Sequence, residues 1–326
     1  MAPFGLRFDF RNPPIGGTSM AERYEAALDM AEWADRLGAV SITVSEHHGS
    51  EDGYLPSALT MAAALAARTR AAAITVAAVV APLHDPLRLA EEAAVVDLIS
   101  AGRLILVLVN GYVASEFDMF GASLGERAQR TTEAVAVLRQ AWTGKPFAYR
   151  GRSVQVTPQP FRPGGPPLLV GGSSEPAARR AARIGDGFLP SSPALWEPYR
   201  DEMRKLGRPD PGPYVGGDTS FVHLSEDPEA GWQAIAPFAL HEVNCYGQWM
   251  VEASVGPEGG YQPVVDADAL RSLGQYRVVT PDVLVAETKE KGPEALVMLH
   301  PLMGGIPPSL AWESLRLFER DVLPRL

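Results

Sequence analysis

Apolar segments short enough for buried strands alternate with longer amphipathic segments along most of the chain. The short segments are apolar throughout, which is typical of strands in a parallel sheet covered on both faces. The predicted strands are Phe4–Phe8, Ser41–Val44, Ile74–Val80, Leu104–Val109, Leu168–Val170, Gly187–Leu189, Tyr214–His223 and Ala295–Leu299.

The longer segments have the 3.6-residue apolar period of helices packed on one side. The predicted helices are Met20–Leu37, Leu55–Thr69, Pro86–Ile99, Glu126–Trp142, Pro176–Ile184, Leu195–Leu206, Pro228–Val243 and Pro308–Val322. Repeated strand–helix alternation across 326 residues predicts an α/β protein, a (β/α)8 TIM barrel forming a single domain over residues 1–326. A doubly wound open sheet is the structural alternative.

Two regions interrupt the alternation. Residues Tyr149–Pro167, after the fourth strand and its helix, are rich in proline and glycine, and we expect an irregular or β-hairpin excursion there. Residues Asn244–Thr280 lack a clear period, which predicts a long loop before the eighth strand. In a barrel, long excursions of this kind usually build or cover the ligand site.

Charge and cysteine content exclude several classes. The net charge of −10 argues against a nucleic-acid-binding protein, which needs clustered lysine and arginine. Cys245 is the only cysteine, so we expect neither an intrachain disulfide nor a cysteine-based metal site. The chain shows no charged leader before an apolar run and no apolar stretch of roughly 20 residues. We therefore expect a cytoplasmic protein that does not cross or bind a membrane.

The second strand ends in Glu46-His47-His48. The C-terminal strand ends of a barrel face the active site, and histidine exchanges protons near neutral pH, so His47 is the candidate catalytic residue. The alternative is one structural histidine and one loop histidine. Adjacent histidines on an extended segment point in opposite directions. Because His84, His223, His241 and His300 also have no close ligand spacing, we expect no metal site.

Three further strand ends are candidates for ligand contacts. Ala77 and Ala78 in the third strand would let a flat ring approach the backbone, although alanine pairs are also common core filler. Asn110, Gly111 and Tyr112 follow the fourth strand. Gly171-Gly172-Ser173-Ser174 precedes an early-helix proline, a composition that exposes backbone N–H groups to a phosphate but is also common in βα loops.

Taken in order, several short segments resemble the bacterial-luciferase-like flavin monooxygenases. They cover nearly the whole chain apart from about residues 195–273, and their order is more specific than any one of them. They are Phe4-Gly5, Ala31–Gly38, Glu46–His48, Asp85-Pro86, Asp97–Arg103, Gly111–Phe117, Arg127, Trp142–Gly144, Gly171–Ser174, Gly185–Gly187, Tyr276–Pro281 and Leu323-Pro324.

The resemblance implies a flavin across the C-terminal mouth of a barrel. His47 matches the family's strand-two histidine, a base or hydrogen-bonding partner of the reduced flavin, and Ala77-Ala78 matches a non-proline cis peptide under the ring. The family's phosphate site uses an arginine after strand four, a second arginine matched by Arg127, and a loop matched by Gly172, Ser173 and Ser174. Asn110 stands where the family has the first arginine, and its neutral amide cannot give the charge-assisted bidentate contact of a guanidinium. That departure leaves room for the deazaflavin coenzyme F420 or for loosely bound reduced FMN.

The leading hypothesis is a monooxygenase that uses O2 and reduced FMN, supplied by a separate flavin reductase, to oxidise a small organic substrate. It fits the absence of a Gly-x-Gly-x-x-Gly segment for a nicotinamide cofactor. The second hypothesis is hydride transfer with coenzyme F420, in which His47 handles the substrate proton. The third is a non-catalytic flavin-binding partner subunit, which the retained His47 argues against.

The substrate pocket is expected in the divergent region, where Tyr246, Trp249, Met250 and Tyr261 are candidate lining residues, although such residues are more often plain packing. The resemblance also implies a homodimer. The alanine-rich segments Met61–Ala67 and Ala90–Val96 are candidates for close helix packing between subunits.

Overall fold

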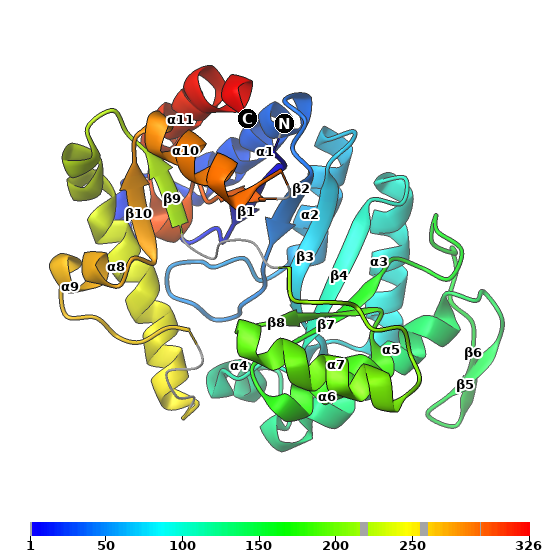
Figure 1. Ribbon diagram of the computed structural model, residues 1–326. Helices are drawn as coiled ribbons and strands as arrows, with labels where there is room; N and C mark the ends of the chain where they lie inside the picture. The colour runs from blue at the N-terminus through cyan, green and yellow to red at the C-terminus, as the bar shows by residue number, and fades with distance from the viewer. Residues whose placement is uncertain (1, 216–220, 255–259, 294) are drawn as a thin grey trace.

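The computed structural model describes residues 2–215, 221–254, 260–293 and 295–326. A parallel sheet of seven strands curls through the molecule in the order β11-β1-β2-β3-β4-β7-β8 (Figure 1). Helices cover its outer face, which confirms the predicted α/β class. The strands are β1 (Phe4–Phe8), β2 (Ser41–Val44), β3 (Ala73–Val80), β4 (Leu104–Val109), β7 (Leu168–Gly172), β8 (Gly187–Pro190) and β11 (Val297–Leu299).

Two further strands form a separate parallel pair, β9 (Phe221–Leu224) and β10 (Tyr276–Val279). The strand predicted at Tyr214–His223 is therefore corrected: residues 214–215 are not in a strand, and residues 216–220 lie outside the described ranges. In the described ranges the ladder runs through seven strands and does not close into a ring of eight. β10 occupies part of the region that the sequence predicted as a loop.

The predicted helices are present with small shifts at their ends. The matching helices are α1 (Met20–Arg36), α2 (Ala58–Arg68), α3 (Pro86–Ile99), α5 (Arg127–Ala141), α6 (Glu175–Ile184), α7 (Trp196–Lys205), α8 (Pro228–Glu252) and α11 (Pro308–Leu317). Local capping explains several of the starts: Ser19 and Glu22 form a capping box on α1, and Asp85 caps α3 ahead of Pro86. No helix in the described part of the chain is both long and apolar enough to cross a membrane.

Three helices were missed by the sequence analysis: α4 (Ala114–Met119), α9 (Ala267–Ser272) and α10 (Pro281–Lys291). The two six-residue helices are too short to display a clear helical period. The excursion predicted from Tyr149 begins slightly earlier, as the antiparallel hairpin of β5 (Phe147–Tyr149) and β6 (Arg152–Val154). It then continues without regular structure to β7.

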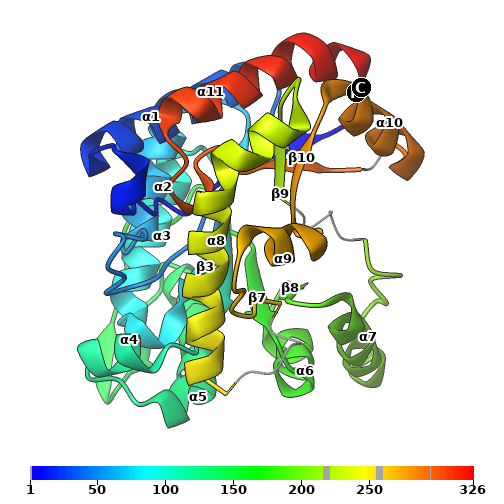
Figure 2. The same cartoon turned by 90° about the vertical axis from the view of Figure 1, so that its left-hand side faces the viewer.

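The predicted loop at Asn244–Thr280 is wrong over much of its length, because α8 continues to Glu252 and α9 and β10 follow. Asn244 and Gly247 are weak helix formers, but here tertiary contacts require them. The Asn244 side chain donates to the Val264 carbonyl and accepts from the Val264 N–H. A Cβ on Gly247 would lie 2.5 Å from the Pro263 nitrogen, so only glycine lets the returning chain pass. In Figure 2, α8 runs from the end near α11 toward the end that carries α4 and α6.

Candidate active site

His47 lies just beyond β2 and is held by a carboxylate that the sequence analysis did not single out. Its Nδ1 lies 2.8 Å from Oε1 of Glu116, a residue of α4 that is 1% exposed. The same oxygen accepts the backbone N–H of His48 at 2.9 Å. Glu116 therefore fixes both the ring and the chain that carries it, and it leaves Nε2 as the free ring nitrogen of His47. The one sequence signal that could have identified Glu116 was its position in the Gly111–Phe117 segment, which carries part of the family resemblance.

His48 points away from His47, as the extended backbone predicted. Its Nε2 lies 2.8 Å from Glu46 Oε1, and Nε2 of His84 lies 2.9 Å from the same oxygen. Burial of Glu46 favours its neutral form, but the hydrogen bonds from His48 and His84 outweigh this effect and hold the pKa of Glu46 below its usual value. The Glu46 carboxylate therefore fixes the wall beside His47.

A cavity of about 380 Å³ opens at the C-terminal ends of the strands. It brings together predicted residues from six separate segments of the sequence. From the predicted set it is lined by His47, Ala77, Ala78, Asn110, Tyr112, Arg127, Gly172, Ser173, Ser174, Tyr246 and Met250. The sequence analysis did not single out Arg7 and Tyr54, which also line it.

The alanine pair lies on the sheet wall of this cavity. The peptide between Ala77 and Ala78 is cis, as the resemblance implied. The pairing of β3 with β4 also shifts at this point: Ala77 pairs with Val107 and Val79 with Leu108, so Ala78 has no partner in the ladder. The methyl side chains leave an open, shallow stretch of wall between His47 and β4.

Arginines gather at the end of the cavity formed after β4 and β7. Arg127 begins α5, and Nη1 of Arg180, on α6, donates to Asn110 Oδ1 at 3.3 Å. Burial lowers the pKa of Arg180, and the positive charges of Arg183 and Arg127 lower it further. Ser174 precedes α6 without capping it through its side chain. Arg180 thus brings a cation to Asn110, where the resemblance led us to expect an arginine.

The opposite wall comes from α8. The Tyr246 hydroxyl lies 2.8 Å from the Tyr54 hydroxyl, and the Tyr261 ring stacks on Tyr246 with centroids 4.5 Å apart. Trp249 does not line the cavity; its ring stacks on His47 with centroids 4.5 Å apart. Of the four residues predicted for the substrate pocket, Tyr246 and Met250 therefore line the cavity directly.

A buried arginine joins α8 to the rest of the site. The guanidinium carbon of Arg11 lies 4.8 to 4.9 Å from the ring centroids of Tyr54, Tyr246 and Trp249, a cation–π arrangement with three rings. Arg11 also pairs with Asp52, which lies in the segment after His48. The aromatic wall is therefore packed around a positive charge that has its counter-ion beside it.

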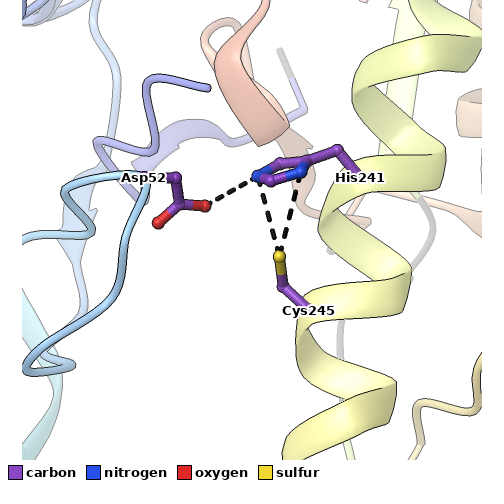
Figure 3. Close-up of side chains that lie close together, drawn as sticks. All are labelled: Asp52, His241 and Cys245. Carbon is purple, nitrogen blue, oxygen red and sulfur yellow. Dashed lines mark hydrogen bonds and ion pairs between the residues drawn. The ribbon is translucent and has the colours of Figure 1, made fainter. Parts of the chain in front are cut away.

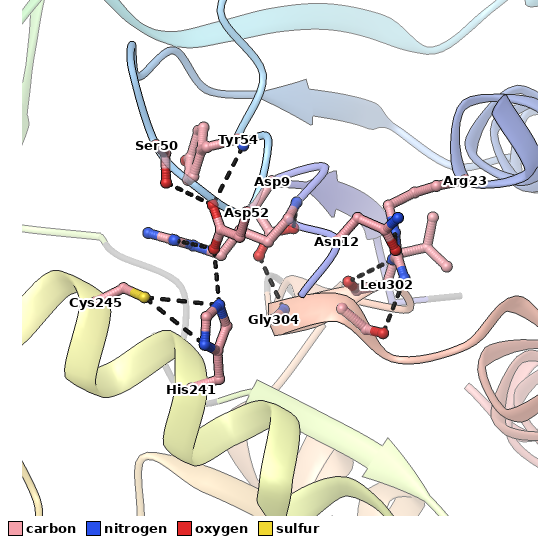
Figure 4. A network of polar contacts seen from close by, with 12 residues as sticks. Asp9, Asn12, Arg23, Ser50, Asp52, Tyr54, His241, Cys245, Leu302 and Gly304 are labelled. Atoms are coloured by element: carbon pink, nitrogen blue, oxygen red, sulfur yellow. Dashed lines mark hydrogen bonds and ion pairs between the residues drawn. The ribbon is translucent and has the colours of Figure 1, made fainter. Parts of the chain in front are cut away.

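Oδ2 of Asp52 also lies 2.8 Å from Nε2 of His241, a residue of α8. The sulfur of Cys245 lies 3.6 Å from the same ring nitrogen (Figure 3). Figure 4 shows Ser50 and the Tyr54 N–H directed at the other oxygen of Asp52. The hydrogen bond to Asp52 raises the pKa of His241 to about 9. Burial disfavours the charged form of Asp52, but the bond from His241 and the charge of Arg11 hold its pKa well below the usual range.

The sequence predicted no ligand-type neighbours for His241, and the fold corrects this. Asp52, His241 and Cys245 each place one potential metal-ligand atom within 4.8 Å of the others. Asp52 and His241 are 189 residues apart in the sequence, so their spacing along the chain does not reveal that they are in contact. Because Arg11 and His241 both donate to Oδ2 of Asp52, this oxygen is already engaged in an ion-pair network that joins the segment after β2 to α8.

Comparison with known proteins gives the family of this chain. The family model described as luciferase-like monooxygenase matches residues 3–273. A crystal structure of a monooxygenase from Streptomyces bottropensis superposes with a TM-score of 0.76 and 27% identity, covering 99% of both chains. An F420-dependent glucose-6-phosphate dehydrogenase from Nocardia farcinica is 25% identical, over 96% of this chain and 97% of its own.

A flavin-dependent trigonelline monooxygenase, oxygenase component, from Acinetobacter baylyi is 30% identical over 45% of this chain and 42% of its own length. Several curated relatives match over only about half of their length. The family match itself extends from β1 to the end of α9 and includes every strand end that lines the cavity. The chain belongs to the luciferase-like monooxygenase family.

Proposed function

We propose that this chain is the oxygenase of a reduced-flavin-dependent monooxygenase, which oxidises a small organic substrate with O2. The observation that carries the proposal is His47, held through Nδ1 by Glu116 on the wall of a cavity that also contains the Ala77–Ala78 peptide. Nothing in the described chain hydrogen-bonds to Nε2 of His47. With Nδ1–H donated to Glu116, Nε2 can accept a proton from an atom in the cavity and return it.

The residues that line the cavity support the binding of a flavin. Ala77 and Ala78 offer a flat wall for the ring, beside His47. Arg127, Ser173 and Ser174 would hold the phosphate, with the N-terminus of α6 behind them. Arg180 supports this assignment, because it supplies a second cation next to Asn110. When bound, reduced FMN would supply the electrons that activate O2, while the protein holds the substrate and excludes water.

The reaction with oxygen tests this proposal. Photoreduced FMN is mixed with the protein without oxygen, oxygen is then admitted, and flavin absorbance is followed by stopped flow. We expect a transient species that free flavin does not form. Flavin oxidation with the kinetics of free FMN, despite measured binding, would contradict the proposal.

Hydride transfer with the deazaflavin coenzyme F420 is the second candidate function. It is favoured by the F420-dependent relative from Nocardia farcinica, which matches nearly the whole of this chain. Separate titrations of the chain with FMN and with F420 distinguish the two candidates. Micromolar binding of F420 together with no binding of FMN would make F420-dependent hydride transfer the leading candidate function. A non-catalytic flavin-binding subunit is disfavoured by the intact His47–Glu116 pair.

The proposal includes an assembly as well as a reaction. A separate reductase would supply the reduced flavin, and the chain would work in the cytoplasm as a homodimer of single-domain (β/α)8 barrels. Ala62, Ala90 and Ala93 of the segments predicted for dimer packing are buried within the chain. The large apolar side chains that α3 exposes are Val95, Leu98 and Ile99. These three residues therefore supply the proposed dimer surface, and light scattering would give the oligomeric state.

A further inference from the structure

Arg7 is a charged side chain inside the curled sheet. Side chains alternate between the two faces of a strand, and on β1 the phenylalanines face the outer helices: Phe4 packs on Phe318, just beyond α11, with centroids 5.0 Å apart. Arg7 has the opposite orientation and lines the cavity with His47 and Tyr54. A strand position otherwise suited to a core residue therefore carries a guanidinium group.

The Arg7 guanidinium is unpaired in the part of the chain that the structure describes. The two buried arginines in the described ranges are paired: Arg11 with Asp52, and Arg23 with the backbone carbonyls of Leu302, Gly305 and Ile306. For Arg7, no hydrogen bond or ion pair joins it to any residue in the described ranges. Arg7 is partly exposed at the cavity wall, so its guanidinium loses part of its hydration without gaining a protein partner, and a bound anion would compensate that loss.

No acid forms an ion pair with Arg7 in the described ranges. Burial, together with the negative charge of Asp9, raises the pKa of Glu242 above its usual value, which favours the neutral form of this carboxyl group. Asp52 is engaged by Arg11 and His241. Other neighbours are the hydroxyls of Tyr54, Tyr246, Tyr261 and Tyr276, which are neutral because burial raises their pKa values. His300 also lies near, and burial together with the charge of Arg7 lowers its pKa well below the usual value. This end of the cavity is therefore positive and rich in hydrogen-bond donors.

Arg7 lies apart from the proposed phosphate site. β1 is separated from β4 by β2 and β3 in the sheet, and the arginines at the other end follow β4 and β7. The wall nearest to Arg7 is that of Tyr54 and Tyr246, next to His47. A group bound by Arg7 thus lies on the substrate side of the cavity.

We propose that Arg7 binds the carboxylate of the substrate, so that the enzyme acts on small organic acids whose body packs on Tyr54 and Tyr246. This inference rests on the proposed function, because it takes the cavity as the shared site of flavin and substrate. The planar guanidinium fork matches the two oxygens of a carboxylate. One arginine balances the single charge of a carboxylate, whereas a phosphate monoester carries nearly two charges.

Binding of benzoate and of benzamide, its neutral isostere, to the full chain tests the proposal by titration calorimetry. We expect the unmodified protein to bind benzoate at least tenfold more tightly than benzamide. Arg7→Gln should lose this preference while benzamide binding stays unchanged. Arg7→Lys, which keeps the charge but not the fork, should retain part of the preference and serves as a second variant if Arg7→Gln does not fold.

Arg180→Gln is the matched control at the other end of the cavity: it should weaken FMN binding and leave benzoate binding intact. Equal affinities for benzoate and benzamide, no benzoate binding, or an unchanged preference in both Arg7 variants would overturn the proposal. Failure of the proposed function is a separate result, since it appears as absent FMN binding or free-flavin oxidation kinetics whatever the benzoate data show.

Discussion

The two walls of the cavity are held in different ways. The wall of β2, β3, β4 and β7 is fixed by parallel backbone ladders, from whose ends His47, the alanine pair and the phosphate-side loop project. The wall of α8 is held by side chains: the Asp52–His241 pair, the Tyr54–Tyr246 hydroxyls and the three rings around Arg11. A substitution in the α8 wall would therefore leave the ladders intact, so the proposed substrate end could change without disturbing the proposed cofactor end.

The largest expected effect is on the ladder wall. His47→Gln should lower turnover by about 10²- to 10⁴-fold, the usual contribution of a general acid–base residue. FMN affinity should change little, because the phosphate site lies after β4 and β7. Steady-state turnover measures the loss of activity, and quenching of FMN fluorescence measures the FMN affinity. Unchanged turnover would favour a partner-subunit role or another catalytic residue.

Glu116→Gln should lower kcat by roughly 10- to 100-fold, the usual cost of losing a hydrogen-bonding partner that orients a functional histidine, with little change in KM, since Glu116 positions His47 through Nδ1. Asp118→Asn is the matched control, because it removes an exposed carboxylate from the same short helix. Separate measurement of kcat and KM, with a thermal melt of each variant, distinguishes positioning from loss of stability. Equal kcat values for the two variants would show that His47 does not depend on Glu116.

At the phosphate end, Arg180→Gln should weaken FMN binding about tenfold, the size of one hydrogen bond to a charged group. Riboflavin, which lacks the phosphate, should bind both proteins equally. Arg179→Gln is the control, because Arg179 pairs with Glu175 and Glu202 rather than with Asn110. An equal loss of affinity for riboflavin and for FMN would show that Arg180 does not contact the phosphate.

The smallest expected effect is on the α8 wall and depends on pH. The pKa of His241 rises from 6.5 to about 9 on folding, so its charged contact with Asp52 contributes fully below pH 6.5 and is lost as the pH rises through about 9. His241→Asn should therefore lower the free energy of unfolding by about 1–2 kcal/mol at pH 6 and by much less at pH 10. Urea unfolding at both pH values measures this, and an equal loss at both would point to packing alone.

The regular part of the fold was predictable from sequence because its signals are local. The mostly apolar strands up to β8 were placed within one or two residues, and the caps of helices such as α1 and α3 mark their starts. The region from Asn244 to Thr280 was not predictable in the same way. Gly247 interrupts the helical pattern in the sequence, and the reason for a glycine there, the close approach of the chain at Pro263, is visible only in the structure.

By itself, the sequence determined which segments come together: His47, Ala77, Ala78, Arg127 and the Gly172–Ser174 loop all line one cavity. Parallel strands bring their ends together whatever the side chains are, so order along the chain was enough. Only the tertiary structure decided the partners of these residues, Glu116 for His47 and Arg180 beside Asn110, and left Arg7 without one. Such contacts join elements tens of residues apart and depend on how helices pack on the sheet, which no local pattern records.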